Sequence, residues 1–116
     1  MYIFFDTETN GLNNSSVLSI AAIKVANNDI IAEYNRFYYP IEKYNYNAIA
    51  VNGLNYKKVT ELRKNNYPRY FINDINSFYD FIKDATHFIG HNISFGYKIY
   101  FSNSTKSYFL YYAFKH

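Results

Sequence analysis

The stretch from Tyr2 to Leu12 constrains the fold of this chain more than any other. The apolar run Tyr2-Ile3-Phe4-Phe5 predicts a buried strand, and it is followed at once by Asp6-Thr7-Glu8. Side chains alternate along a strand, so Asp6 and Glu8 are expected on the same face. Two like charges that close repel unless a cation lies between them or one is protonated. Oxygen ligands at this spacing suit Mg²⁺ or Mn²⁺, whereas the plain alternative is two solvated acids at a strand end.

Composition limits the class of protein that can carry this stretch. A chain of 116 residues with 49% hydrophobic and 22% aromatic residues predicts one folded domain and argues against disorder. The absence of cysteine excludes disulfides and thiolate metal sites within this sequence, and it is compatible with the cytoplasmic location that we expect. Asp6 interrupts the apolar N-terminal stretch, so neither a signal peptide nor a membrane segment is expected. A net charge of +3 mildly favours a polyanionic partner.

Two further strands are expected directly after the first. Residues 16–26 are apolar on both alternating faces, which is typical of a central strand. Asn27-Asn28-Asp29 is a hairpin-type turn, and residues 30–39 read as a third strand that Pro40 ends. The turn residues Thr9-Asn10-Gly11 separate the first strand from the second. The first part of the chain therefore predicts a three-stranded meander.

The second half of the chain predicts helices and one more strand. Apolar spacing favours a helix over residues 48–53 with Gly53 as its C-cap, and Asn55 is a candidate cap for a helix over 56–62. A clearer helix is expected over 73–84, begun by Asn73 or Asp74. Its apolar stripe falls at i, i+3, i+4 and i+7 and is expected in the core: Ile75, Phe78, Tyr79 and Ile82. Residues 87–90 predict a short buried strand.

Two motifs resemble those of a known enzyme family. Asp6-x-Glu8-Thr9-x-Gly11-Leu12 after a hydrophobic strand closely resembles the first motif of the DEDD-type 3′→5′ exonucleases, the group that includes the epsilon subunit of bacterial DNA polymerase III. The run His91-Asn92-Ile93-Ser94-Phe95, after a strand that ends at Gly90, resembles the second motif. The resemblance implies an α/β fold: a ribonuclease H-like mixed sheet flanked by helices, with the 16–26 and 30–39 strands antiparallel and the 87–90 strand parallel to the first.

The same resemblance implies an activity and a set of site residues. The activity would be 3′→5′ hydrolysis of single-stranded DNA or RNA with two divalent ions, Mg²⁺ or Mn²⁺. Asp6 and Glu8 would be the catalytic and metal-binding residues. Five residues would contact the substrate: Thr7, Thr9, Leu12, His91 and Phe95. The implied partners are 3′ ends of nucleic acid and a polymerase subunit.

The sequence departs from the family pattern at three points. Gly96 stands where the family has a third metal-binding Asp, the third motif is absent, and Asn52 replaces a His that contacts substrate in the family. The resemblance therefore covers about residues 2–95, and we assign residues 1–95 to an incomplete exonuclease domain, truncated at its C-terminus. Residues 96–116 form a C-terminal tail. Either a reading-frame accident precedes Gly96, or Gly96 is a true residue of a diverged protein.

Three functional hypotheses remain open on the sequence alone. The chain is an exonuclease, or it is a catalytically inactive remnant of that family that binds nucleic acid or a protein partner, or it is an unrelated α/β domain with a chance match. Titration with a divalent ion separates the first two, because a working site binds two ions and a degenerate site binds at most one weakly.

Overall fold

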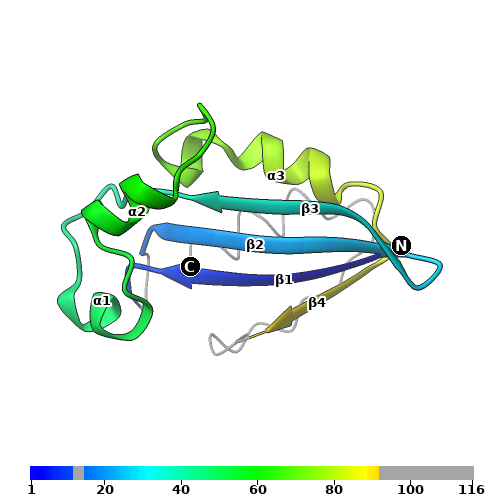
Figure 1. Cartoon of the computed structure of the whole chain (residues 1–116), viewed down its shortest axis with the longest axis horizontal. Coiled ribbons are helices and arrows are strands. Elements are labelled where there is room, and N and C mark those ends of the chain that lie inside the picture. Colours follow the sequence, from blue (N-terminus) through cyan, green and yellow to red (C-terminus); the bar gives the residue numbers. More distant parts are fainter. Residues whose placement is uncertain (12–14, 92–116) are drawn as a thin grey trace.

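A four-stranded mixed sheet forms the centre of the molecule (Figure 1). The computed structural model describes residues 1–11 and 15–91. The strands are β1 (Tyr2–Thr9), β2 (Val17–Ala26), β3 (Asp29–Phe37) and β4 (His87–His91), in the order β3-β2-β1-β4. β1 and β3 lie antiparallel on either side of β2, and β4 lies parallel to β1. The fold class and strand directions predicted from the sequence are confirmed.

The turn between β2 and β3 is shorter than the sequence suggested. Asn27 and Asn28 alone form the loop, and both have left-handed backbone angles, with φ of 53° and 66°. Asparagine tolerates this conformation better than most residues, and a two-residue turn of this kind matches the twist of the paired strands. β3 consequently begins at Asp29. It ends at Phe37, two residues before the predicted end.

Two short helices follow β3, and each has the caps that its sequence favours. α1 (Tyr46–Asn52) begins two residues earlier than predicted, because the Asn45 side chain accepts hydrogen bonds from the backbone N–H groups of Asn47 and Ala48. It ends at Gly53, which has φ of 72°. α2 (Tyr56–Leu62) has the predicted bounds, and Asn55 accepts from the Lys58 N–H at 2.8 Å.

The predicted helix over 73–84 is divided in the structure. A 3-10 turn, η1 (Phe71–Asn73), precedes α3 (Ile75–Ile82). Asp74 stands at the N-cap position but its side chain makes no capping hydrogen bond. Its carboxylate instead accepts hydrogen bonds from Arg36 of β3 and from Tyr38, which directly follows β3. The long-range contacts therefore outweigh the local capping preference on which the sequence prediction rested.

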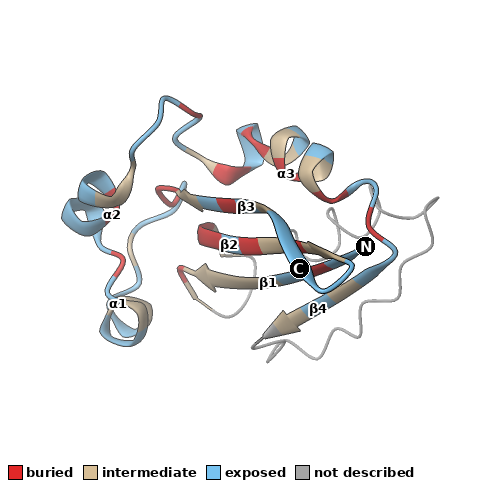
Figure 2. Ribbon diagram, turned by 45° about the vertical axis from the view of Figure 1, so that its right-hand side comes forward, coloured by how far each residue is buried: buried red, intermediate tan, exposed pale blue. Residues whose placement is uncertain are grey.

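The sheet has two different faces. α3 covers one of them, and buried side chains from β1, β2, β3 and α3 form the main core there (Figures 1 and 2). Phe78 and Ile82 of the predicted stripe are 2% and 1% exposed, so that stripe is core as expected. A smaller core of Leu18, Tyr39, Leu54 and Val59 supports α2. The opposite face of the sheet carries Asp6. No helix of the described residues is long and apolar enough to cross a membrane.

Candidate functional site

Asp6 and Glu8 lie on β1, which has β2 on one side and β4 on the other. Alternation along the strand places both carboxylates on the face opposite α3. Their register partners on β2 are the small residues Ala21 and Ser19, and the Cα partner of Asp6 on β4 is His91.

The electrostatics of the pair fit a bound cation. Asp6 Oδ1 is buried and has no hydrogen-bond partner among the described residues. Burial raises the pKa of Glu8, and the negative charge of Asp6 raises it further. A buried carboxylate oxygen without a partner costs folding free energy. A divalent ion would give this oxygen a partner and would neutralise the negative charge. Asp6 and Glu8 are therefore the residues that could hold a metal.

The two carboxylates stand without a third ligand in the described part of the chain. No group of three or more His, Cys, Asp or Glu side chains within residues 1–11 and 15–91 is placed to hold a metal ion. A pair of carboxylates suits one divalent ion with several retained waters, as Mg²⁺ prefers. If a divalent ion binds here, the described residues supply two of its ligands.

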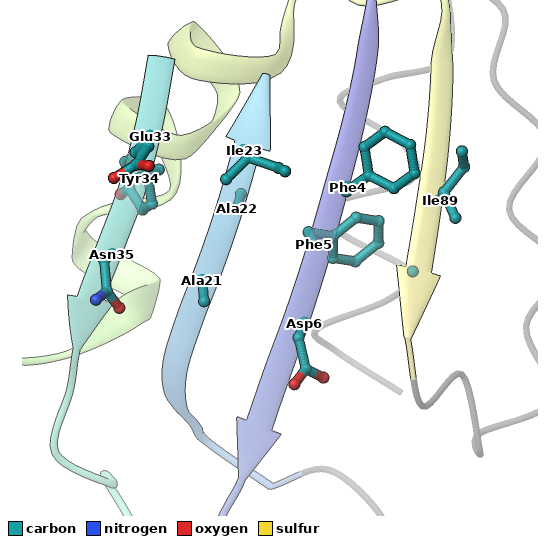
Figure 3. Close-up of a pocket in the computed structure, with 11 residues that line it drawn as sticks. Phe4, Phe5, Asp6, Ala21, Ala22, Ile23, Glu33, Tyr34, Asn35 and Ile89 are labelled. Atoms are coloured by element: carbon teal, nitrogen blue, oxygen red, sulfur yellow. The ribbon is translucent and has the colours of Figure 1, made fainter. Parts of the chain in front are cut away.

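Asp6 also borders an open hollow on the face of the sheet opposite α3 (Figure 3). The hollow has a volume of about 550 Å³. Phe4 and Ile89 line it and remain 39% and 45% exposed. Glu33 and Asn35 line it on the β3 side. The predicted carboxylate is therefore reachable from an apolar concave surface.

The turn after β1 is fixed by a buried asparagine. Asn10 is 1% exposed, and its Nδ2 donates to Glu42 Oε2 at 2.7 Å and to the Lys43 carbonyl at 2.9 Å. Its Oδ1 accepts from the Asn45 backbone N–H at 2.9 Å. One side chain thus joins the end of β1 to the segment that precedes α1.

Glu42 completes this network from an exposed position. Its Oε1 accepts from the Ser16 hydroxyl at 2.7 Å, and its Oε2 also accepts from the Ser16 N–H at 3.3 Å. Burial alone would raise the pKa of Glu42, but the hydrogen bonds from Ser16 and Asn10 outweigh that effect and lower it. Glu42 is therefore held ionised and anchors both sides of the turn.

Asn52 joins the C-terminal end of α1 to the end of β1. Its Nδ2 donates to the Thr9 carbonyl at 3.0 Å, and its Oδ1 accepts from the Leu54 N–H at 2.9 Å. The family resemblance places a substrate-contacting His at this position. Here the side chain has a supporting contact with the turn, so it positions Thr9 and Gly11.

The structure brings some of the predicted site residues together and leaves others apart. Thr9 lies at the turn, and its hydroxyl donates to the Gly11 carbonyl at 2.7 Å. Thr7 pairs with Ile20, and alternation places its side chain on the α3 face, away from the carboxylates. β4 ends at His91. Leu12, Phe95, Gly96 and the 96–116 tail lie outside the described residues.

Sequence reasoning did not single out Asn10, Glu42 or Asn45 as parts of the site. The sequence indicates Asn10 only as a turn residue. The partners of Asn10 are 32 to 35 residues away along the chain, so no local spacing signals them. The one signal of this network in the sequence is Glu42, an isolated acid after Ile41.

Comparisons with known proteins found similar sequences and a similar fold. The family model RNase_T, described as exonuclease, matches residues 3–112. PolC-type DNA polymerases III from Staphylococcus epidermidis and Staphylococcus haemolyticus are each 33% identical over 97 residues. The match covers 81% of this chain, and the chain spans only about 6% of the length of these relatives.

A solved structure shares the fold. Exonuclease X, determined in complex with 5′ overhanging duplex DNA, superposes with a TM-score of 0.57 at 21% sequence identity. The similarity covers 82% of this chain and 51% of that one. At this identity the likeness concerns the fold.

Proposed function

The chain belongs to the DEDD-type exonucleases, the family of the RNase_T model, and we propose that it binds a divalent ion through Asp6 and Glu8 and hydrolyses nucleic acid from the 3′ end. The observation that carries the proposal is the buried Oδ1 of Asp6, which has no hydrogen-bond partner within the described ranges and lies beside Glu8, whose pKa is raised. Membership of an exonuclease family supports nuclease chemistry in general. The substrate, single-stranded DNA or RNA, and the ion, Mg²⁺ or Mn²⁺, are the finer parts of the proposal.

Each group has a defined role in this proposal. A bound divalent ion would supply Lewis-acid activation of water and stabilise negative charge on the phosphate. Asp6 and Glu8 would hold the ion, while the turn at Thr9 and Gly11, fixed by Asn10 and Asn52, would set the position of the terminal nucleotide. Leu12, His91 and Phe95 remain predicted substrate contacts, whereas Thr7 would contact the substrate only through its backbone, because its side chain lies on the α3 face.

A second candidate function is binding of nucleic acid ends or of a polymerase subunit without hydrolysis. The absence of a third metal-ligating side chain beside Asp6 and Glu8 within the described ranges favours it. The PolC-type relatives are polymerases by name, and this supports a polymerase as the protein partner.

A gel assay separates the two functions. A 5′-labelled single-stranded 20-mer, in DNA and RNA forms, is incubated with the full chain in Mg²⁺, in Mn²⁺ or in EDTA. Hydrolysis from the 3′ end yields a ladder that shortens with time, depends on the ion, and is lost in Asp6→Asn but kept in the matched variant Glu33→Gln. Binding of the oligonucleotide without any ladder supports the second function. A ladder of equal strength in Asp6→Asn contradicts the first.

A further inference from the structure

The basic side chains of the described residues are concentrated in one segment. Residues 43–69 contain six of the nine Lys and Arg residues within the described ranges and one acid, Glu61. The six are Lys43, Lys57, Lys58, Arg63, Lys64 and Arg69. The remaining described residues hold three basic and eight acidic side chains. The segment that contains α1 and α2 is thus strongly basic within an otherwise acidic part of the molecule.

The two groups of basic residues also differ in their partners. Lys24, Arg36 and Lys83, outside the segment, form ion pairs with Asp84, Asp74 and Asp80. Over the described ranges, none of the six basic residues of 43–69 forms an ion pair with a carboxylate. Unpaired cations gathered on one surface attract polyanions, and each contact with a phosphate releases a counterion. Where these cations are exposed and make no other contact, their positive charge is available to an external ligand.

One of the six has a structural role instead. The Arg63 guanidinium donates to the carbonyls of Phe37, Pro68 and Tyr67, and it lies 4.1 Å from the Tyr67 ring centroid. It holds the end of α2 against the sheet. Lys57, Lys58 and Lys64 are exposed, which leaves their ammonium groups free to contact phosphates.

Aromatic side chains accompany these cations. Tyr46 and Tyr56 are 83% and 56% exposed, and the Tyr56 ring lies 5.2 Å from that of Tyr39. Arg69 lies 4.4 Å from the Tyr39 ring centroid. The Tyr44 hydroxyl is buried without a hydrogen-bond partner among the described residues. Exposed aromatic rings between basic side chains are typical of surfaces that bind single-stranded nucleic acid.

This basic segment is joined directly to the end of the strand that carries the carboxylates. Asn10 donates to the Lys43 carbonyl, Asn45 donates to Asn10, and Asn52 donates to the Thr9 carbonyl. Figure 1 shows α1 and α2 at the end of the sheet where β1 finishes. A nucleic acid strand whose 3′ end lies at Asp6 and Glu8 would therefore next meet the basic residues of 43–69.

We propose that residues 43–69 form a backbone-binding surface for the single strand whose 3′ end reaches Asp6 and Glu8, with Lys57, Lys58 and Lys64 as phosphate contacts and Tyr56 as a stacking platform. The inference rests on the proposed function for the identity of the strand. The ligand chemistry is a phosphodiester backbone, which DNA and RNA share.

Fluorescence anisotropy with 5′-labelled oligo-dT and oligo-rU of 20 nucleotides tests this surface. The titrations are made in EDTA, so that neither metal binding nor cleavage contributes, and at salt concentrations from 50 to 200 mM. The variant is Lys57→Ala/Lys58→Ala/Lys64→Ala in the full chain. Its matched control removes three positive charges elsewhere: Lys98→Ala/Lys106→Ala/Lys115→Ala. Circular dichroism verifies that both variants fold.

The basic-surface variant should bind at least tenfold more weakly than the wild type at 50 mM salt. The slope of log affinity against log salt concentration should be smaller in magnitude by about 2, because each of the three lost phosphate contacts on a single strand removes about 0.7 from that slope. The control variant should change both quantities much less. Comparing oligo-dT with oligo-rU shows which backbone the surface prefers.

Three results would overturn the inference: no binding by the wild type, unchanged affinity and slope in the basic-surface variant, or an equal loss in the control. The proposed function fails separately. If the oligonucleotide binds through the lysines but is not shortened in Mn²⁺, the surface stands and the hydrolytic role fails. If hydrolysis proceeds with an unchanged KM in the basic-surface variant, the hydrolytic role stands and the proposed surface fails.

Discussion

Two carboxylates of this protein lie in contrasting environments. Asp74, between η1 and α3, is 5% exposed and accepts hydrogen bonds from Arg36 and Tyr38, each at 2.7 Å. Asp6, on β1, has a buried Oδ1 with no partner within the described ranges. Arg36 also lies 4.9 Å from the Tyr34 ring centroid, so the environment of Asp74 is filled. The environment of Asp6 opens into a hollow.

The contrast separates structure from function in physical terms. A buried charge is tolerated when a partner charge and hydrogen bonds replace water, and its removal then leaves the partner stranded. A buried carboxylate oxygen without these partners weakens the fold unless a ligand binds it. Asp74 is therefore a structural carboxylate that joins α3 to β3, whereas Asp6 is kept in a costly position that a cation would relieve.

Replacement of Asp74 should give the largest loss of stability. Asp74→Ala leaves Arg36 without its ion pair and Tyr38 without its acceptor, so we expect the free energy of unfolding to fall by about 3–5 kcal/mol. Urea denaturation followed by circular dichroism measures it. The control is Asp80→Ala, which removes an exposed i,i+3 pair with Lys83 and should cost less than about 0.5 kcal/mol. Equal losses in the two variants would remove the distinction drawn for Asp74.

Replacement of Asn10 should have the next largest effect. Asn10→Ala leaves the Asn45 N–H and the Lys43 carbonyl without their partner and takes one donor from Glu42, so a loss of about 2 kcal/mol is expected. Asn47→Ala, an exposed position in the first turn of α1, serves as the control and should change stability by less than about 0.5 kcal/mol. If Asn10→Ala leaves the free energy of unfolding unchanged, the turn is held by other contacts.

Replacement of Asp6 should not weaken the fold. Asp6→Asn removes the negative charge next to Glu8, so without divalent ions the stability should rise by up to about 1 kcal/mol. Glu33→Gln, on the exposed edge of the same hollow, is the matched control and should leave stability unchanged. A loss of 2 kcal/mol or more in Asp6→Asn would place Asp6 in the same class as Asp74.

The pH dependence should show the smallest effects, with opposite signs at two glutamates. The pKa of Glu8 is raised in the folded state, so the native protein binds more protons than the unfolded chain between the ordinary value of 4.5 and the raised value. Stability from Glu8 is therefore present at low pH and is lost as pH rises through that raised pKa.

Glu42 behaves in the opposite way. Its pKa is lowered in the folded state, so its contribution is present above 4.5 and is lost as pH falls through the lowered value. Unfolding curves of Glu8→Gln and Glu42→Gln against wild type from pH 3 to 7 reveal both trends. Glu8→Gln should be the more stable variant relative to wild type at pH 7, and Glu42→Gln the less stable one. The same sign for both glutamates would contradict these assignments.

The elements were predictable where their signals are local. The apolar run Tyr2–Phe5, the Gly53 cap and the Asn55 cap each act within a few residues. The structure forms the strand and both caps, but Tyr2 and Phe4 are 44% and 39% exposed, so the strand is buried on one face only. The role of Asp74 was not predictable, because its partners Arg36 and Tyr38 lie 38 and 36 residues earlier. A local rule makes such a residue a helix cap.

The two acids of the candidate site were predictable from the sequence. The burial and the hydrogen bonds that surround them were not. A strand that ends in Asp-x-Glu places both carboxylates on one face by alternation alone. The burial of Asp6 Oδ1 and the network that joins Asn10 to Glu42 depend on how distant segments meet. The same alternation turns the Thr7 side chain toward α3, which the family resemblance alone does not reveal.

The most direct test of the central claim, that Asp6 and Glu8 hold a divalent ion, is calorimetric titration of the full chain with Mn²⁺. Wild type and Glu33→Gln should bind Mn²⁺ with the same affinity, and Asp6→Asn should show no binding. Mn²⁺ should also raise the midpoint of unfolding of the wild type and leave that of Asp6→Asn unchanged. An unchanged Mn²⁺ affinity in Asp6→Asn would contradict the claim.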